Sequence, residues 1–214
     1  MKIIDCQQRT AQWFAARLGL PTASRFGDVL ARLKSGEPAA AARDYALALA
    51  LERVTQQMQQ QFVNAAMVRG AELEDEARAA YETRTGNLVN QVGFCMHDTV
   101  AAGCSPDGLV GAEGILEIKC PENQLKIAAL WLTGNASEYL PQIQGQLWIT
   151  GRQWCDLVVY DPRLRSGQME VLVLRIKRDE AYIAALAAAV DEFCKTVDQQ
   201  EADLRASARA AVRS

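Results

Sequence analysis

Histidine is nearly absent from this chain of 214 residues, in which His97 is the only copy. The six cysteines are scattered and none belongs to a Cys-x-x-Cys pair, so the usual zinc ligand sets cannot be completed. A catalytic cysteine needs a base beside it, and His97 offers the only imidazole. The sequence therefore disfavours a zinc site and a Cys–His nucleophile, and it predicts reduced, buried thiols.

Long apolar runs are missing too, since none approaches the roughly 20 residues that a membrane-spanning helix needs. The start of the chain, "MKIIDCQQRT", reaches Arg9 before the apolar core of a signal peptide can form. We therefore expect a soluble, intracellular protein that does not bind membranes. A basic excess is also lacking, and the net charge of −3 disfavours a non-specific coat for nucleic acid.

Half of the residues are hydrophobic, which is enough for a substantial core, and the length requires no more than one domain. We interpret residues 1–214 as a single domain. Up to Gly86, the apolar spacing and strong helix formers predict mainly helices, with Gly86 as a C-terminal cap. The expected helices cover residues 22–33, 43–62 and 68–86.

From Asn87 onward, short segments rich in β-branched residues alternate with Gly, Pro and Asp turns, as is typical of strands. The expected strands lie within 88–96, 100–110, 114–120, 155–161 and 169–176. Helices are expected at 122–134, at 137–151 with Pro141 in the first turn, and at 178–212. This order indicates an α/β fold with a mixed central β-sheet flanked by helices.

Charged residues interrupt one of these strands. Alternate side chains of a strand share a face and lie about 7 Å apart, so "LEIKC" places Glu117 and Lys119 on one face and its apolar side chains on the other. The preceding "SPDG" is a turn signal that starts a hairpin. The hairpin would bring Asp107 back beside Glu117.

Two carboxylates with a lysine suit hard cations such as Mg²⁺ or Mn²⁺. Asp107 and Glu117 would bind the cation, and the backbone carbonyl of Ile118 could be a further oxygen ligand. Such a cation polarises a phosphodiester and lowers the pKa of a bound water, and a second cation can steady the leaving oxygen. Lys119 would orient the attacking water or assist its deprotonation. The alternative is an ordinary hairpin with a Glu–Lys pair on a solvated face.

The motif "CSPDG" followed by "LEIKCP" is accompanied by other blocks along the chain. These are "RTAQWFAARLGLPTAS" at 9–24, "RGAELEDEA" at 69–77 and "YLPQIQGQLWITG" at 139–151, which a strand and "YDPR" at 160–163 follow. In this order the blocks resemble the phage lambda exonuclease and YqaJ-type viral recombinase family of PD-(D/E)xK nucleases. The resemblance spans most of the chain and implies a restriction-endonuclease-like fold.

The resemblance also implies roles for residues outside the motif. Arg17 would hold the 5′-terminal phosphate of DNA, assisted by Ser24 at the start of a helix, because guanidinium groups and helix N-termini favour phosphate oxygens. Glu74 would help to position the metal or its water. Gln144, with Gln142 as a secondary candidate, would hold the nucleophilic water or the scissile region.

The activity implied by the resemblance is a Mg²⁺-dependent exonuclease that degrades the 5′-ended strand of linear duplex DNA to mononucleotides and leaves a 3′ single-stranded tail. Two ions are expected, and Mn²⁺ should replace Mg²⁺. A ring-shaped homotrimer on double-stranded DNA ends, a single-strand annealing protein as partner, and a phage or prophage gene expressed in the bacterial cytoplasm are also implied. An endonuclease or 5′-flap enzyme, a non-catalytic DNA-end-binding module and a small-molecule metallohydrolase stay open as alternatives.

Overall fold

The computed structural model describes residues 1–59 and 65–213. Its helices are α1 (Ala11–Arg17), α2 (Phe26–Leu30), α3 (Ala40–Thr55), α4 (Ala65–Thr85), α5 (Gln124–Thr133), α6 (Leu140–Thr150) and α7 (Glu180–Arg213). Short 3-10 turns are η1 (Ala23–Arg25), η2 (Ser137–Tyr139) and η3 (Pro162–Gly167). None of the helices in these two ranges is long and apolar enough to cross a membrane.

The strands form two sheets. They are β1 (Lys2–Ile4), β2 (Val89–Asn90), β3 (Phe94–Met96), β4 (Gly103–Cys104), β5 (Gly108–Val110), β6 (Gly114–Lys119), β7 (Trp154–Tyr160) and β8 (Val171–Lys177). The larger sheet has the order β2-β5-β6-β7-β8, and β6 and β7 are parallel whereas its other neighbours are antiparallel. The smaller sheet, β1-β3-β4, is antiparallel. The predicted α/β fold with a mixed central sheet and flanking helices is therefore confirmed.

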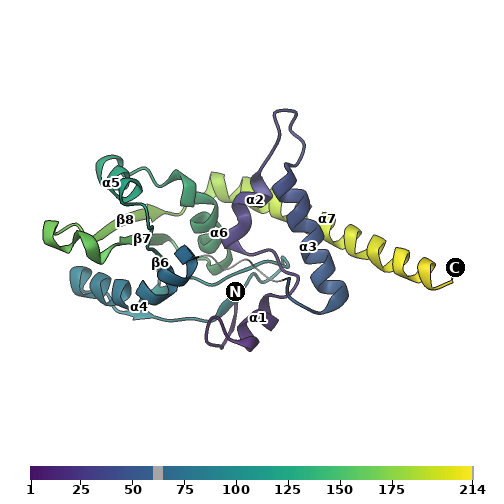
Figure 1. Cartoon of the computed structure of the whole chain (residues 1–214), viewed down its shortest axis with the longest axis horizontal. Helices are drawn as coiled ribbons and strands as arrows, with labels where there is room; N and C mark the ends of the chain where they lie inside the picture. Colours follow the sequence, from purple (N-terminus) through teal and green to yellow (C-terminus); the bar gives the residue numbers. More distant parts are fainter. Residues whose placement is uncertain (60–64, 214) are drawn as a thin grey trace.

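Alternate residues of β6 face opposite sides of the central sheet. Ile115 packs with apolar residues of α5 and α6, whereas Leu116 and Ile118 pack with residues of α4. Figure 1 shows α5 and α4 on either side of the strands. Because both faces are covered, nearly every side chain of β6 is buried, and a charged residue in this strand must find its partners inside the protein.

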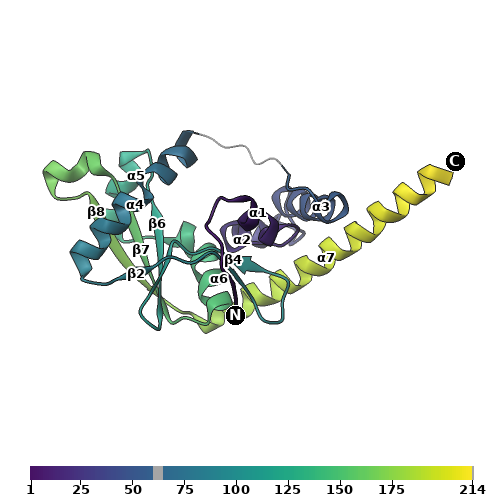
Figure 2. The ribbon, with the colours of Figure 1, turned by 90° about the horizontal axis from the view of Figure 1, so that it is seen from below.

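A further apolar cluster joins α2, α3, α6 and α7 to the smaller sheet, with Phe26, Leu49 and Val190 among its buried members. Gly145 lets α2 approach α6 closely, since a Cβ atom at this position would lie 2.4 Å from the ring of Phe26. Val197 of α7 belongs to this cluster and Leu204 packs against it, and the end of the helix after Leu204 projects from the body of the molecule (Figure 2).

Two predicted helices end earlier than expected. The helix predicted for 22–33 consists of η1 and α2 and ends at Leu30, after which the backbone amide of Leu33 bonds to the Glu37 carbonyl and closes a loop. The helix predicted for 43–62 ends at Thr55, where Gln56 adopts a left-handed φ of 57°. The last part of that prediction, residues 60–62, lies outside the described residues.

Other predicted features are confirmed. Gly86 follows α4 with a φ of 73°, and its amide bonds to the Glu82 carbonyl as in a C-terminal cap. Pro141 lies in the first turn of α6. The helix α1 and the strand β1 were not predicted, because α1 is only one to two turns long and β1 has three residues. The strands β3 and β4 lie within the predicted strand segments 88–96 and 100–110, although they belong to the smaller sheet.

Candidate active site

The hairpin formed by β5 and β6 carries the predicted carboxylates. Gly108 is paired with Leu116, and one residue earlier the amide of Asp107 donates to the carbonyl of Leu116 at 3.1 Å. The side chain of Asp107 then accepts a hydrogen bond at Oδ2 from the backbone amide of Ile118, at 2.6 Å. The prediction that a turn brings Asp107 beside the strand of Glu117 is therefore confirmed.

Glu117 is a buried carboxylate with only 3% of its surface exposed. Helix α6 supplies two of its partners, since Nε2 of Gln142 donates to Oε1 and Nε2 of Gln146 donates to Oε2, each at 2.6 Å. The Nζ atom of Lys119 lies 2.7 Å from Oε1. Burial of an ionised carboxylate is tolerated only with such partners, so the strand and the helix together hold Glu117 in one position.

Lys119 lies on the same face of β6 as Glu117, as the alternation predicted, and its Nζ also donates to Oε1 of Gln142 at 3.0 Å. Burial by itself lowers the pKa of Lys119. The attraction of Glu117 and the hydrogen bond that Lys119 donates to it, followed by the attraction of Asp107, outweigh burial, and the pKa lies above its ordinary value. Lys119 is therefore an ammonium group that is held between the carboxylate of Glu117 and the amide oxygen of Gln142.

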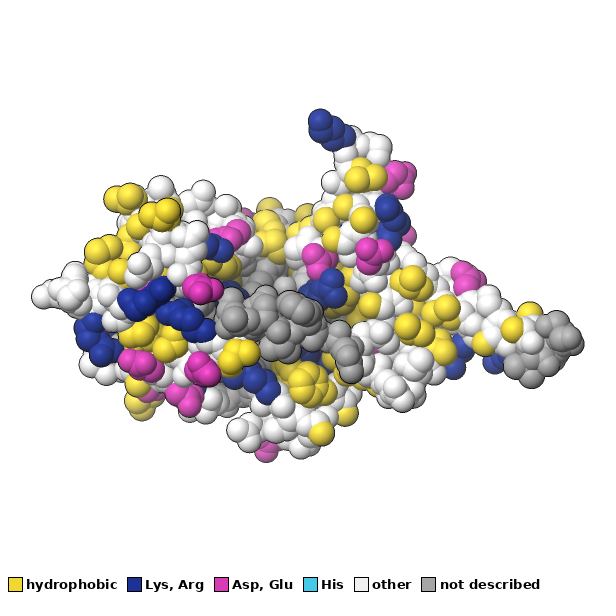
Figure 3. Space-filling model, viewed as in Figure 1, with side chains coloured by type: hydrophobic (Ala, Val, Ile, Leu, Met, Phe, Trp, Pro, Cys, Tyr) yellow, Lys and Arg dark blue, Asp and Glu magenta, His cyan; other side chains and the backbone are white. Residues whose placement is uncertain are grey.

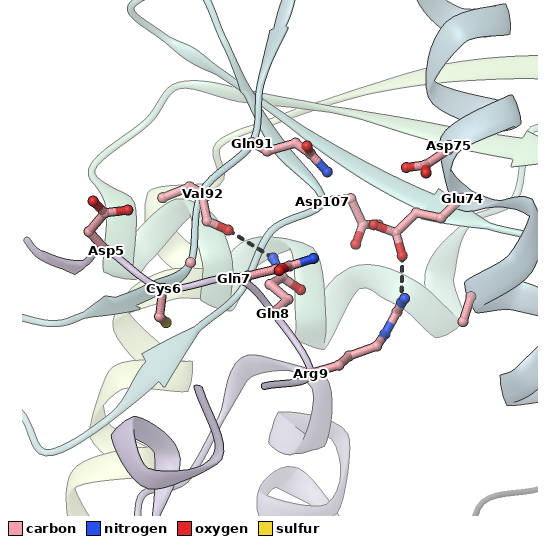
Figure 4. Close-up of a pocket in the computed structure, with 12 residues that line it drawn as sticks. Asp5, Cys6, Gln7, Gln8, Arg9, Glu74, Asp75, Gln91, Val92 and Asp107 are labelled. Carbon is pink, nitrogen blue, oxygen red and sulfur yellow. Dashed lines mark hydrogen bonds and ion pairs between the residues drawn. The ribbon is translucent and has the colours of Figure 1, made fainter. Parts of the chain in front are cut away.

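The third carboxylate of this region belongs to Glu74 of α4. Burial, and then repulsion from Glu117 and Glu74, raises the pKa of Asp107 well above its ordinary value, despite the hydrogen bond from Ile118 and the attraction of Lys119. Figure 4 shows the Glu74 and Asp107 side chains directed toward each other. On its other side, Oε2 of Glu74 forms an ion pair of 2.5 Å with the guanidinium of Arg9.

A cavity of about 470 Å³ adjoins these carboxylates (Figure 4). Its walls are the segment between β1 and α1, one side of α4, the loop before β3, and Asp107; they comprise Asp5, Cys6, Gln7, Gln8, Arg9, Ala71, Glu74, Asp75, Gln91, Val92, Gly93 and Asp107. Of these described lining residues four are acidic and Arg9 alone is basic. The space next to the motif is thus open, polar and predominantly negative.

Arg17, the predicted phosphate ligand, ends α1 and stacks on Trp13, with its guanidinium carbon 3.9 Å from the ring centroid. Its Nε atom is buried and has no hydrogen-bond partner in the described residues. Burial lowers the pKa of Arg17, against the attraction of Tyr45 and Glu52. Trp13 in turn donates to Oγ of Ser105 at 2.8 Å, which ties α1 to the loop leading to the motif.

Ser24 lies in η1 and is exposed. Its Oγ is 3.3 Å from Oγ1 of Thr22, whose amide donates to the hydroxyl of Tyr45 at 3.0 Å. The ring of Tyr45 is covered by Arg25, whose guanidinium carbon lies 3.8 Å from its centroid. The role of Arg17 and Ser24 in binding phosphate stays a prediction.

The position of Gln144 corrects the expectation from the sequence. Its Nε2 donates to the Lys177 carbonyl at 2.9 Å and its Oε1 accepts from the Asp179 amide at 3.0 Å, so its side chain holds the start of α7 and does not reach the motif. Gln142, the secondary candidate, takes that place beside Lys119. Gln146 was missed, although a spacing of four residues from Gln142 puts both on one face of a helix.

The donor atoms at this strand end fit a hard divalent cation. Asp107 and Glu117 offer carboxylate oxygens, and a cation there would offset both the burial and the repulsion that raise the pKa of Asp107. Within residues 1–59 and 65–213, no three His, Cys, Asp or Glu side chains are already arranged to hold a metal. Glu74 in particular is turned to Arg9. The carbonyl of Ile118 as a ligand stays a prediction.

The fold and the site together define a class of protein, the mixed α/β proteins with a PD-(D/E)xK motif, formed here by Pro106, Asp107, Glu117 and Lys119 at one end of the central sheet. The particular family follows from comparison with known proteins. The chain belongs to the YqaJ-like viral recombinase domain family, which matches residues 12–153.

Several known proteins are similar to this chain. Two crystal structures of LHK-Exo, an alkaline exonuclease from Laribacter hongkongensis, are 42% identical in sequence to this chain, and one of them is a complex with dAMP. The matches cover 94% of this chain and 100% of LHK-Exo, with TM-scores of 0.86 for the complex and 0.85 for the other structure. A phage related exonuclease from Haemophilus somnus 129PT, 14% identical over 88% of this chain and 96% of its own, has a TM-score of 0.67 and shares the fold. The uncharacterized protein ExoD of Escherichia coli (strain K12) is 31% identical over 68 residues, which are 32% of this chain and 76% of that protein.

Proposed function

We propose that the chain is a nuclease that acts on DNA ends, namely a Mg²⁺-dependent exonuclease that degrades the 5′-ended strand of linear duplex DNA to mononucleotides and leaves a 3′ single-stranded tail. The observation that carries this proposal is the set of Asp107, Glu117 and Lys119 around one strand end, beside an open polar cavity. The likeness to LHK-Exo, an exonuclease crystallised with a mononucleotide, supports it.

Each residue of the site would have a distinct task. Asp107 and Glu117, with Glu74 and the Ile118 carbonyl as further oxygen donors, would hold one or two divalent cations. Bound Mg²⁺ would supply Lewis acidity toward the phosphodiester and a water of lowered pKa. Lys119, held by Glu117 and Gln142, would donate hydrogen bonds that orient the attacking water. Gln146 would keep the Glu117 carboxylate in place.

Recognition of the 5′ end would fall to Arg17 and Ser24. The unpartnered Nε of Arg17 supports this assignment, because a buried guanidinium donor without a partner is costly and a phosphate oxygen would satisfy it. If Arg17 and Ser24 bind the 5′ phosphate while Asp107 and Glu117 hold the cation, the 5′-ended strand is the one that reaches the cation and is cut.

The assembly that we propose is a ring of three copies around DNA, with a single-strand annealing protein as partner, in the bacterial cytoplasm as the product of a phage or prophage gene. Apolar side chains gather over α5 in Figure 3, where Leu125 and Leu132 are 80% and 87% exposed. Such exposure supports contacts with other chains. With a net charge of −3, basic residues would have to line the channel of the ring while the exterior stays acidic. Light scattering of the purified protein tests the trimer.

The decisive experiment uses linear duplex DNA labelled at either end, with and without a 5′ phosphate, incubated with Mg²⁺ and resolved by product length. We expect mononucleotides from the 5′-ended strand and faster cleavage of the phosphorylated end. The same reaction without a divalent cation should give no product. Release of long fragments, or loss of the 3′-ended strand, would contradict the proposal.

A covalently closed circular duplex separates the proposal from its rivals. An end-dependent exonuclease leaves circles intact, whereas an endonuclease cuts them. A flap enzyme would act on a 5′-branched substrate in preference to a blunt end. Binding of ends with no cleavage under any divalent cation would indicate a non-catalytic module, and hydrolysis of free nucleotides alone would indicate a small-molecule metallohydrolase.

A further inference from the structure

Arg9 has an unusual backbone conformation for its place in the chain. Three non-glycine residues in the described part of the chain have a positive φ, namely Arg9, Gln56 and Gln168. Gln56 and Gln168 follow a helix or a 3-10 turn as its C-terminal cap, where the left-handed conformation is common. Arg9, with a φ of 67°, precedes the N-terminal cap of α1 instead, so no helix end requires this conformation.

Interactions on both sides of Arg9 impose the conformation. Nε2 of Gln8 donates to the carbonyls of Val92, at 2.9 Å, and Pro106, at 3.0 Å. Thr10 donates through Oγ1 to the carbonyl of Gln7 at 2.6 Å. Pro106 directly precedes Asp107, so the turn that presents Arg9 is anchored to the motif itself. An unfavourable backbone conformation that its surroundings impose in this way is characteristic of functional sites.

Figure 4 shows the side chain of Arg9 projecting from this turn to the edge of the cavity and toward Glu74. The two side chains form an ion pair of 2.5 Å. The Arg9 side chain is 55% exposed, whereas that of Glu74 is 16% exposed. The guanidinium thus has one side on a carboxylate and the other in solvent. An exposed ion pair of this kind is worth little by itself, so the pair alone does not explain why a strained backbone is kept.

The charge of the cavity indicates a role for Arg9 in binding phosphate. Asp5, Glu74, Asp75 and Asp107 line it together with Arg9, the one basic residue among the described lining residues. A DNA phosphate that approaches Asp107 is repelled by the other three carboxylates, and Arg9 is the lining side chain that can bind it by charge-assisted hydrogen bonds.

We propose that Arg9 is a substrate-binding residue that contacts a backbone phosphate of DNA at the mouth of this cavity, exchanging its pairing with Glu74 for the phosphate oxygens. The exchange leaves the Glu74 carboxylate free to act on the metal or its water. This inference rests on the proposed function. It assigns a second phosphate contact on the metal side of the site, apart from that of Arg17.

The test uses Arg9→Gly, because glycine adopts a φ of 67° without strain and the variant loses the guanidinium while the turn is kept. Binding of a short linear duplex is measured without Mg²⁺ over a range of salt concentrations. We expect binding to weaken by roughly 10- to 100-fold and the slope of log K against log salt to fall by about 1, as for the loss of one phosphate contact. Arg9→Lys should restore the slope.

Two control variants separate the phosphate contact from general effects. Gln168→Gly makes the same backbone change outside the cavity and should leave binding and the salt slope at the wild-type values. Arg84→Gln removes an exposed arginine at the far end of the helix that carries Glu74 and should also leave the slope unchanged. An Arg84→Gln effect as large as that of Arg9→Gly would overturn the inference.

The Mg²⁺ concentration that cleavage requires distinguishes two roles of Arg9, namely binding a DNA phosphate and only orienting the Glu74 carboxylate. If Arg9 binds phosphate, Arg9→Gly raises KM for DNA and leaves the Mg²⁺ concentration for half-maximal cleavage within about twofold of wild type. If Arg9 only orients Glu74, Arg9→Gly and Glu74→Gln shift the Mg²⁺ requirement alike and the salt slope stays at the wild-type value, which overturns the inference. Wild-type protein that neither binds nor cleaves the duplex would overturn the proposed function together with it.

Discussion

The backbone amide of Ile118 donates a hydrogen bond of 2.6 Å to Oδ2 of Asp107, a residue eleven positions earlier in the chain. This bond extends the hairpin beyond its last paired residues and fixes the carboxylate at the end of the strand that carries Glu117. The same position is unfavourable for a charge, because burial and the neighbouring Glu117 and Glu74 raise the pKa of Asp107. The site therefore holds a carboxylate where the fold alone would favour a neutral group.

Asp107→Asn should make the protein more stable and less active. The amide keeps an oxygen that can accept from Ile118 but removes the repulsion from Glu117 and Glu74. We expect the variant at pH 8 without Mg²⁺ to melt about 2–4 °C above wild type, which corresponds to about 1 kcal/mol for a chain of this size. Cleavage of linear duplex should fall by roughly 10²–10³-fold or more, as when a key electrostatic group is removed.

The control for this variant is Asp5→Asn in the same cavity, which should change neither property by much. Mg²⁺ should raise the melting temperature of wild type and of Asp5→Asn but not of Asp107→Asn, measured by differential scanning fluorimetry. A wild-type rate of cleavage by Asp107→Asn would show that Asp107 is not part of the active site.

Gln142 and Gln144 should respond differently to the same substitution. Gln142→Ala removes a partner of both Glu117 and Lys119, so cleavage should fall by roughly 10- to 100-fold, and the loss of one donor to the buried Glu117 carboxylate should also lower stability by about 1–3 kcal/mol. Gln144→Ala removes bonds to the Lys177 carbonyl and the Asp179 amide, so stability should fall by about 1–3 kcal/mol while the rate per folded molecule is kept. Urea unfolding and initial rates measure the two effects, and an equal loss of rate would contradict this division.

The positions of Gln142 and Gln144 show which part of the site could not be inferred from the sequence. The strand β6 could be predicted with its two faces, because alternation in "LEIKC" and the turn residues of "SPDG" are local signals. Which glutamine of α6 faces Glu117 depends on how the helix is rotated against the sheet. That rotation is set by the packing of residues such as Ile143 and Leu147 in the core, and no local pattern reports it.

Contacts between distant parts of the chain were likewise not predictable. The ion pair of Arg9 with Glu74 joins residues 65 positions apart, and the helix α1 is held by the bond from Trp13 to Ser105 across 92 positions. A helix of seven residues has little stability of its own, so its existence depends on such contacts. The motif was predictable because it lies within one hairpin, whereas the cavity beside it is assembled from four segments.

Acid stability should depend on Asp161, a fully buried carboxylate at the end of β7. Burial raises its pKa, but the hydrogen bonds from Arg163, followed by the attraction of Arg163 and Arg69, outweigh that effect and hold the pKa below its ordinary value. Because the folded pKa is depressed, this stabilisation is present above the unfolded pKa of about 3.9 and is lost as the pH falls through the folded pKa. The pH window of the loss is thus below about pH 4.

Asp161→Asn tests this window. We expect a loss of about 1–3 kcal/mol at pH 7, in line with charge-assisted hydrogen bonds, and a smaller difference from wild type as the pH falls below about 4. Urea unfolding at a series of pH values measures it. Arg69 and Arg163 also donate to the carbonyls of Cys120 and Glu122, directly after Lys119, so the variant should lose some cleavage as well. A difference in stability that grows toward low pH would contradict the assignment.

Arg17 should determine how strongly the enzyme prefers a phosphorylated 5′ end. Its Nε is a buried donor without a partner, and the stack on Trp13 fixes the plane of the guanidinium. A 5′ phosphate would complete this site with charge-assisted bonds worth about 1.5–3 kcal/mol, a factor of roughly 10–100 in kcat/KM. Arg17→Ala should therefore cleave phosphorylated and unphosphorylated ends at nearly equal rates. The control is Arg43→Ala, which changes an exposed arginine of α3 that donates to the Pro38 carbonyl. This variant should keep the wild-type preference for the phosphorylated end. Equal preference in wild type and Arg17→Ala would place the recognition of the 5′ end elsewhere in the molecule.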